Sequence, residues 1–204
     1  MSVASLVWQT IDYVKGAEVY LIQPEQIVIA ASGPAEFPDR DGGGPYVHFV
    51  ARMSYVNSGA AGYNATIRAE RVRITVAGRR FEQQWFRYVH SDADSTDATK
   101  LVVDKVSEAR PLPVTAGSAE SHETLFQPWE KECSSSRPQC DRRENYVDWK
   151  TFLQWFAPSR KLELEFLADI YGKAEPILAK CRIEMEPQHV ANLTARGWAS
   201  PVCR

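Results

Sequence analysis

The chain has 204 residues and a formal net charge of -2, with 44% hydrophobic and 25% charged residues, as is typical of a globular protein. This length suits one domain that buries a sizeable core. No block of like charge is long enough to suggest a tail for nucleic acid or anionic lipid, so we expect no nucleic-acid partner. No apolar run approaches the roughly 20 residues that span a bilayer, and the N-terminus has neither the basic nor the apolar region of a secretion signal.

The N-terminal residues 1–16 carry apolar side chains at helical spacing, including Val3, Leu6, Val7 and Val14. This pattern is typical of an amphipathic helix, and also of the end of a membrane anchor whose upstream part has been removed. Both interpretations stay open. We predict a helical stub or linker at 1–16, a β domain at 17–187 and a C-terminal tail at 188–204 with weak structure of its own.

Most of the β domain shows the two-residue period of strands. Residues 46–56 predict a strand with one buried face, formed by Val47, Phe49, Ala51, Met53 and Tyr55. Strict alternation along residues 81–90 predicts a central strand covered on both sides, with Phe81, Trp85 and Val89 on one face and Phe86 and Tyr88 on the other.

The apolar positions of residues 65–76 change parity halfway along the segment. A strand cannot change face without an extra residue, so we predict a bulge near Glu70 and Arg71. Further on, Pro111 and Pro113 cannot donate to a sheet ladder and predict an edge strand or a bend.

A helix is predicted inside the domain after residue 145, from apolar residues at three- and four-residue steps. Asn145 is the expected N-cap and Pro158 the expected end. Residues 161–171 and 177–185 then alternate cleanly and predict an antiparallel hairpin with one buried face.

Together, eight to ten short strands with one late helix predict an antiparallel immunoglobulin-like β-sandwich that also has a short N-terminal helix. A closed barrel is the alternative, because alternation does not distinguish closure of a sheet from stacking of two sheets. Regular alternation of strands and helices is absent, which argues against a doubly wound α/β fold.

Four cysteines bear on the compartment of the protein. Cys133 and Cys140 flank a short serine-rich run, and Cys203 could pin the tail to the strand that carries Cys181. Neither spacing is that of a zinc or redox motif, so two structural disulfides are the leading interpretation, with free buried thiols or metal or redox use left open. Two disulfides would indicate an oxidising compartment such as the periplasm.

His122 and Glu123 form the most suggestive pair of side chains for chemistry or binding. Adjacent strand residues point to opposite faces, so the pair cannot share a ligand, and a structural role is favoured, such as Glu123 accepting hydrogen bonds from backbone or arginine. A metal-dependent hydrolase that uses His48, His90, His122 and Glu123 is an alternative function.

Asp92, Asp94 and Asp97 resemble a calcium loop in carboxylate density but lack its glycine and its distant glutamate, so a solvated turn is expected. The chain contains no nucleotide-binding, serine-hydrolase or zinc-protease motif. We therefore predict no enzymatic activity, no cofactor and no metal.

Aromatic residues are abundant, with six Trp, eight Tyr and eight Phe. Most are expected in the core. Five are expected in loops, at the ends or on the helix, namely Trp8, Tyr63, Trp129, Trp155 and Trp198. These could instead stack on a sugar or peptide. A carbohydrate- or ligand-binding module is therefore the second alternative function.

The segments YVHFVARMSYVNSGAAGYNATIRAERVRI (46–74) and PVTAGSAESHETLFQPW (113–129) are similar to small bacterial proteins with an N-terminal membrane anchor and an extracytoplasmic immunoglobulin-like β-sandwich. The resemblance covers about residues 8–187 in organisation and transfers no functional residue. It implies a domain outside the cytoplasm that is anchored in the inner membrane. The predicted sandwich, the predicted disulfides and the absence of catalytic motifs favour a non-enzymatic domain of the cell envelope, whose partner is another envelope protein. Such a partner would bind at a sheet edge or on the face beside the helix.

Overall fold

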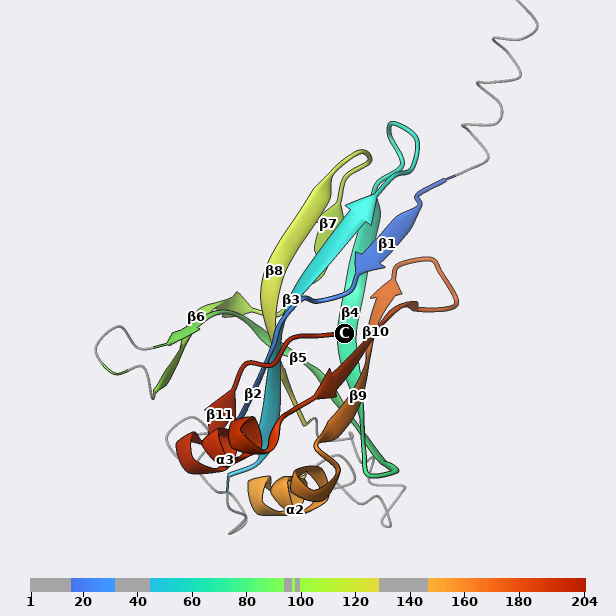
Figure 1. Ribbon diagram of the computed structural model, residues 1–204. Coiled ribbons are helices and arrows are strands. Elements are labelled where there is room, and N and C mark those ends of the chain that lie inside the picture. The colour runs from blue at the N-terminus through green and yellow to red at the C-terminus, as the bar shows by residue number, and fades with distance from the viewer. Residues whose placement is uncertain (1–15, 32–44, 94–96, 98–99, 129–146) are drawn as a thin grey trace, which may run out of the picture.

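The computed structural model describes residues 16–31, 45–93, 97, 100–128 and 147–204 (Figure 1). Within them the chain forms two helices and one antiparallel sheet of eleven strands. The strands are β1 (Val19–Ile22), β2 (Ile27–Ala31), β3 (Val47–Asn57), β4 (Ala65–Val76), β5 (Arg79–Ala93), β6 (Leu101–Glu108), β7 (Leu112–Val114), β8 (Ala119–Gln127), β9 (Lys161–Ile170), β10 (Ile177–Glu184) and β11 (Trp198–Ala199).

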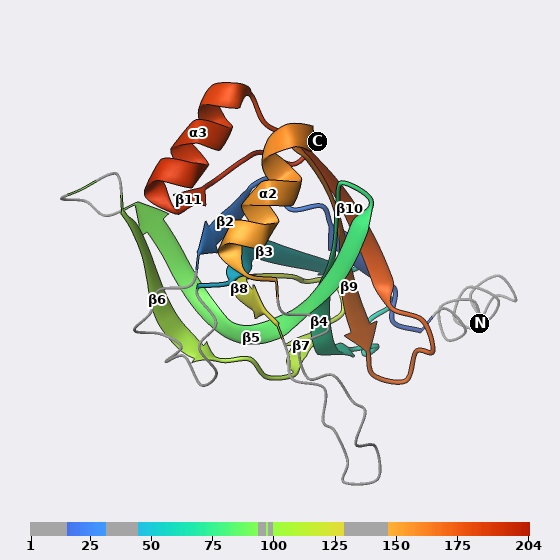
Figure 2. The same ribbon diagram turned by 90° about the horizontal axis from the view of Figure 1, so that it is seen from below.

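The strands lie in the order β10-β9-β4-β5-β8-β3-β2-β11, while β1 pairs with β3, β6 with β5 and β7 with β4. The sheet curls into a half-barrel around its inner face (Figure 2). The predicted mainly β, antiparallel class is confirmed. The finer prediction of an immunoglobulin-like sandwich is not, because the described strands belong to one hydrogen-bonded sheet.

The inner face of the curled sheet holds the main hydrophobic core. The alternation predicted for residues 46–56 is confirmed, since Phe49, Ala51, Met53 and Tyr55 are all buried in it. Helix α2 (Trp149–Ser159) lies across one open end of the half-barrel (Figure 2) and packs the ring of Phe152 edge-on against Phe49, with the ring centroids 6.2 Å apart.

The predicted bulge in β4 is present, as a register shift against β9 between Ile67 and Ala69. It lies slightly upstream of the predicted position. Because the extra residue comes before Glu70, the parity change turns Glu70 onto the inner face, where its side chain is fully buried.

The strict alternation predicted for β5 is wrong beyond Trp85, because a second register shift falls between Trp85 and Arg87. As a result Tyr88 contacts Trp85 on the inner face, with ring centroids 6.1 Å apart. Val89 joins Phe86 in a small apolar cluster on the other face of the sheet.

Helix α2 starts one turn later than the expected Asn145, which lies outside the described residues. Asp148 is the N-cap, and its side chain accepts a hydrogen bond from the Thr151 amide at 2.9 Å. The helix also continues past Pro158 to Ser159 and ends where Arg160 adopts a left-handed conformation with φ 55°. A proline in the last turn costs a hydrogen bond without preventing the turn from forming.

The C-terminal tail is more ordered than predicted. It forms helix α3 (Pro187–Arg196) and β11, which pairs with β2. Beyond β11, the Cys203 amide donates to the Glu25 carbonyl at 2.9 Å, and Arg204 exchanges two 3.0 Å hydrogen bonds with Arg182 in β10. The tail therefore bridges the two ends of the curled sheet.

A disulfide between Cys181 and Cys203 fastens this bridge, with the two Cα atoms 5.2 Å apart. This predicted pairing is confirmed. Cys133 and Cys140 lie outside the described residues.

Candidate functional site

A buried carboxylate cluster lies inside the half-barrel, at a point where three strands turn polar side chains inward. Glu70 from β4 accepts hydrogen bonds from the Tyr55 hydroxyl at 2.7 Å and from Thr124 Oγ1 at 2.6 Å. The Nε2 atom of His122 lies 2.7 Å from Glu70 Oε1. Three partners thus offset the cost of burying this carboxylate, which an apolar core would not tolerate alone.

Two tyrosines frame the cluster and stay protonated. Burial raises the pKa of Tyr55, and the adjacent Glu70 carboxylate raises it further. Burial likewise raises the pKa of Tyr88, whose hydroxyl donates to the Arg110 carbonyl at 2.8 Å and whose ring lies 4.3 Å from that of His122. The tyrosines therefore act here as fixed donors and packing surfaces.

The pairing of an imidazole with a buried carboxylate is the arrangement that orients a general base. In this cluster, however, the three polar partners of Glu70 satisfy the hydrogen-bonding capacity of its buried carboxylate. The side chain of His122 is only 13% exposed. The groove described next lies on the other face of the sheet and is not lined by His122. The cluster is therefore best understood as a polar element of the core.

A groove of about 610 Å³ opens on the outer face of the sheet. Its floor comes from β2, β3 and β8, one wall from the β1–β2 turn together with β11 and the residue after it, and the other wall from the end of β5 and the start of β6. The β5–β6 arm that forms this second wall extends away from the body of the protein (Figure 1). This volume lies within the range of small-ligand and peptide-side-chain sites.

Glu123 lies in the floor of the groove and is the neighbour of His122 on the opposite face, as predicted. Its carboxylate accepts hydrogen bonds from Arg52 at 2.9 Å and from the amide and hydroxyl of Ser91 at 2.8 and 2.9 Å. These contacts tie β3, β5 and β8 together where β5 begins to separate from β8. Glu123 thus has a structural role, and its proposed role in binding stays a prediction.

The histidines predicted as a possible metal site do not come together. In the described ranges, no three His, Cys, Asp or Glu side chains are placed to hold a metal ion. His48 is buried with neither ring nitrogen hydrogen bonded, and this burial lowers its pKa to about 4. His90 is exposed on β5, whereas His122 belongs to the buried carboxylate cluster.

The candidate aromatic residues are dispersed. Trp155 on α2 packs against the core and has the Arg79 guanidinium 4.7 Å from its ring centroid. Tyr63 is partly buried in the β3–β4 loop, where its carbonyl accepts a hydrogen bond from Asn57. Trp198 in β11 lines the groove. Trp8 and Trp129 lie outside the described residues.

The predicted aspartate turn is only partly described. Asp92, at the end of β5, lines the groove and accepts a 2.8 Å hydrogen bond from the Ala93 amide. Asp97 forms an ion pair with Lys100 at 3.4 Å, and Asp94 lies outside the described residues. Local backbone and lysine contacts of this kind are those of a solvated turn.

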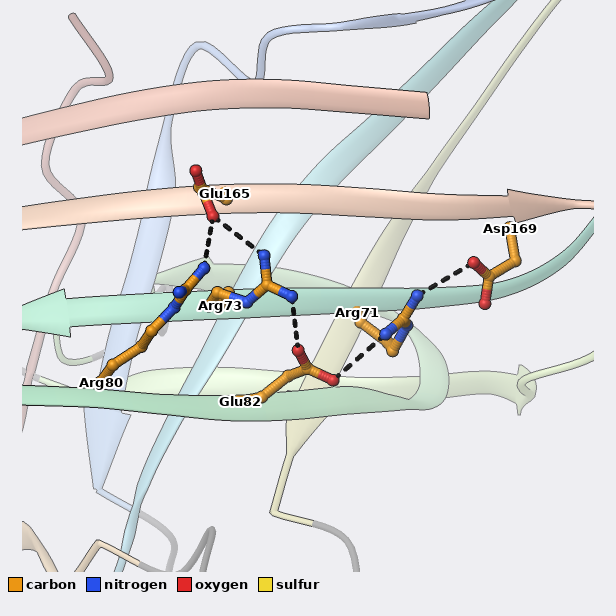
Figure 3. A network of polar contacts seen from close by, with 6 residues as sticks. All are labelled: Arg71, Arg73, Arg80, Glu82, Glu165 and Asp169. Atoms are coloured by element: carbon orange, nitrogen blue, oxygen red, sulfur yellow. Dashed lines mark hydrogen bonds and ion pairs between the residues drawn. The ribbon is translucent and has the colours of Figure 1, made fainter. Parts of the chain in front are cut away.

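Outside the groove, the outer face of β4, β5 and β9 carries a ladder of alternating charges (Figure 3). Arg73 bridges Glu82 at 3.4 Å and Glu165 at 3.0 Å, and a hydrogen bond from Arg73 lowers the pKa of Glu165. Arg71 similarly bridges Glu82 and Asp169. This face is internally compensated and presents little net charge to a ligand.

Sequence reasoning missed Glu70 and the groove. The available signal for Glu70 was a lone carboxylate at the point where a strand pattern changes face. For the groove there was no comparable signal, because its walls come from segments far apart in the chain.

No family model, curated protein or solved structure matches the chain. In the part of the chain that the structure describes, neither helix has the length and apolar character needed to cross a membrane.

Proposed function

We propose that the protein is a non-enzymatic interaction domain of the bacterial cell envelope, anchored in the inner membrane, that binds an extended segment of another envelope protein. The observation that carries the proposal is the strand β6, which pairs with β5 on one side and with no described strand on the other. A free strand edge is a template for strand addition, a binding mode that requires no catalytic residue.

The register shows which main-chain groups of β6 face the free edge. Ser91 of β5 lies opposite Val103 and directs its amide away from β6, toward Glu123. Ser91 and Val103 therefore form a non-hydrogen-bonded antiparallel pair, in which both residues direct their main-chain groups away from each other. The same alternation makes the amide of Lys105, opposite Val89, point to the free edge.

Two further observations support an extracytoplasmic location. The disulfide between Cys181 and Cys203 is of the kind that persists in oxidising compartments. The second is the similarity of residues 46–74 and 113–129 to membrane-anchored extracytoplasmic proteins.

The test is a photo-crosslinking experiment in living cells. A photoreactive residue at Val106, which is 68% exposed on β6, should capture a partner, and mass spectrometry should locate the crosslink in an extended segment. Lys105→Pro removes an edge-facing amide and should abolish the crosslink, because proline cannot donate to an added strand. Lys105→Thr removes the same charge but keeps the amide, and should retain the crosslink. Equal crosslinking by both variants, or none from β6 in the parent protein, would refute strand addition.

A further inference from the structure

We propose that the groove on the outer face binds a lysine- or arginine-bearing peptide segment, at a site separate from the β6 edge. The groove is lined by three carboxylates, Glu25, Asp92 and Glu123, and by one cation, Arg52. Because Arg52 is already paired with Glu123, the charge left over in the groove is negative.

Glu25 and Asp92 supply this negative charge from opposite walls. Glu25 is exposed on the β1–β2 turn, and Asp92 is exposed near the end of β5. Among the described residues, neither carboxylate has a cationic side chain within ion-pair distance, in contrast to the compensated carboxylates on the outer face of β9. A cation entering between them meets two uncompensated acceptors.

The rest of the lining suits a peptide better than a compact ion. Val28, Val50 and Leu101 offer an apolar surface for the stem of a long basic side chain or for a neighbouring aliphatic residue. Hydroxyl and amide groups stand around this surface and can hydrogen bond to a peptide backbone; they belong to Gln23, Gln26, Ser54 and Ser200.

The β5 amides that face this groove already have partners. The amide of Ser91 is taken by Glu123, and the amide of Ala93 is taken by the Asp92 side chain. The wall is therefore protected against strand addition, and recognition falls to side chains. This separates the groove from the free edge of β6, so the two sites can be tested independently.

The experiment measures fluorescence anisotropy of labelled peptides with the purified protein under non-reducing conditions. A peptide that alternates lysine and valine should bind, and peptides with serine or glutamate in place of lysine should bind at least about tenfold more weakly. Rising salt should weaken binding of the lysine peptide. The variant Glu25→Gln/Asp92→Asn should lose about tenfold in affinity for it.

Two control variants make the result specific. Glu163→Gln/Glu175→Gln changes the net charge equally, but at exposed positions of β9 and the β9–β10 turn that do not line the groove, and should bind as the parent does. Lys105→Pro should leave this binding unchanged. Equal binding of lysine and glutamate peptides, or equal loss in the control and groove variants, would overturn the inference. Loss in Lys105→Pro alone would assign the peptide to the β6 edge, overturning the groove inference while supporting the proposed function.

Discussion

The Tyr55 hydroxyl donates a 2.7 Å hydrogen bond to the fully buried carboxylate of Glu70. Tyr55 lies on β3 and Glu70 on β4, the next strand in sequence, and the hydrogen bond crosses the interior of the half-barrel. β3 and β4 are not hydrogen-bonded neighbours in the sheet. The contact therefore links two separate parts of the curled sheet through a side chain, and its loss should affect the whole fold.

Tyr55→Phe should lower the free energy of unfolding by about 1–3 kcal/mol, because it leaves a buried acceptor with one donor fewer. Urea denaturation would measure the change. Tyr20→Phe is the matched control, since Tyr20 is half exposed on β1 and its loss should cost under about 0.5 kcal/mol. Similar effects of the two variants would show that Glu70 does not depend on Tyr55.

Acid should destabilise the protein through His48. Its pKa is about 4 in the folded protein and about 6.5 in the unfolded chain, so the folded state favours the neutral imidazole. The stability contributed by neutral His48 is full above pH 6.5 and is lost as the pH falls toward 4, by up to about 3 kcal/mol.

His48→Phe should therefore flatten the dependence of unfolding free energy on pH between about 6.5 and 4. Denaturation series at several pH values would measure this slope. His90→Gln, which changes an exposed histidine, should keep the parent slope. An unchanged slope in His48→Phe would show that another group controls acid sensitivity.

Removal of the described disulfide should destabilise the fold. Cys181 and Cys203 are separated by 22 positions, and the loop-entropy relation gives about 3 kcal/mol for a loop of this size. Cys181→Ser/Cys203→Ser should unfold at correspondingly lower urea concentration. Hydrogen exchange should also quicken at β11, whose tail would be held only by hydrogen bonds. Parent-like exchange at β11 in this variant would contradict the role given to the disulfide.

The charge ladder on the outer face should contribute less to the stability of the protein than the disulfide does. Arg73→Met removes contacts to Glu82 and Glu165, yet it should cost only about 1 kcal/mol, because all three side chains are partly solvated. The cost should shrink as salt is added. Thermal unfolding at low and high salt measures both effects, and a large salt-independent loss would indicate a packing role instead.

Local patterns predicted much of this fold. The buried face of β3, the β9–β10 hairpin and the edge position of β7 follow from alternation and from proline chemistry within each segment. The bulge in β5 was missed because aromatic residues occupy both parities around it, and no change of polarity marks the extra residue.

Long-range features were harder to predict. The carboxylate cluster joins residues from three strands, and the groove joins the β1–β2 turn to β5 and β11. Such groupings depend on how the sheet curls, which alternation does not encode. The tail was underestimated because its order comes from pairing with β2 and β10 as well as from its own sequence.

The position of β4 has a consequence for how the chain folds. β4 pairs with β5 through a tight turn at Ala77 and Gly78. Its other long partner is β9, which comes much later in the chain, and Ile74 of β4 pairs with Leu164 of β9. Contacts between residues so far apart in sequence form slowly, since the intervening chain must first be ordered. Until β9 docks, the main-chain edge of β4 that pairs with β9 is open to other chains. A chaperone that covers strand edges would therefore be expected to raise the refolding yield.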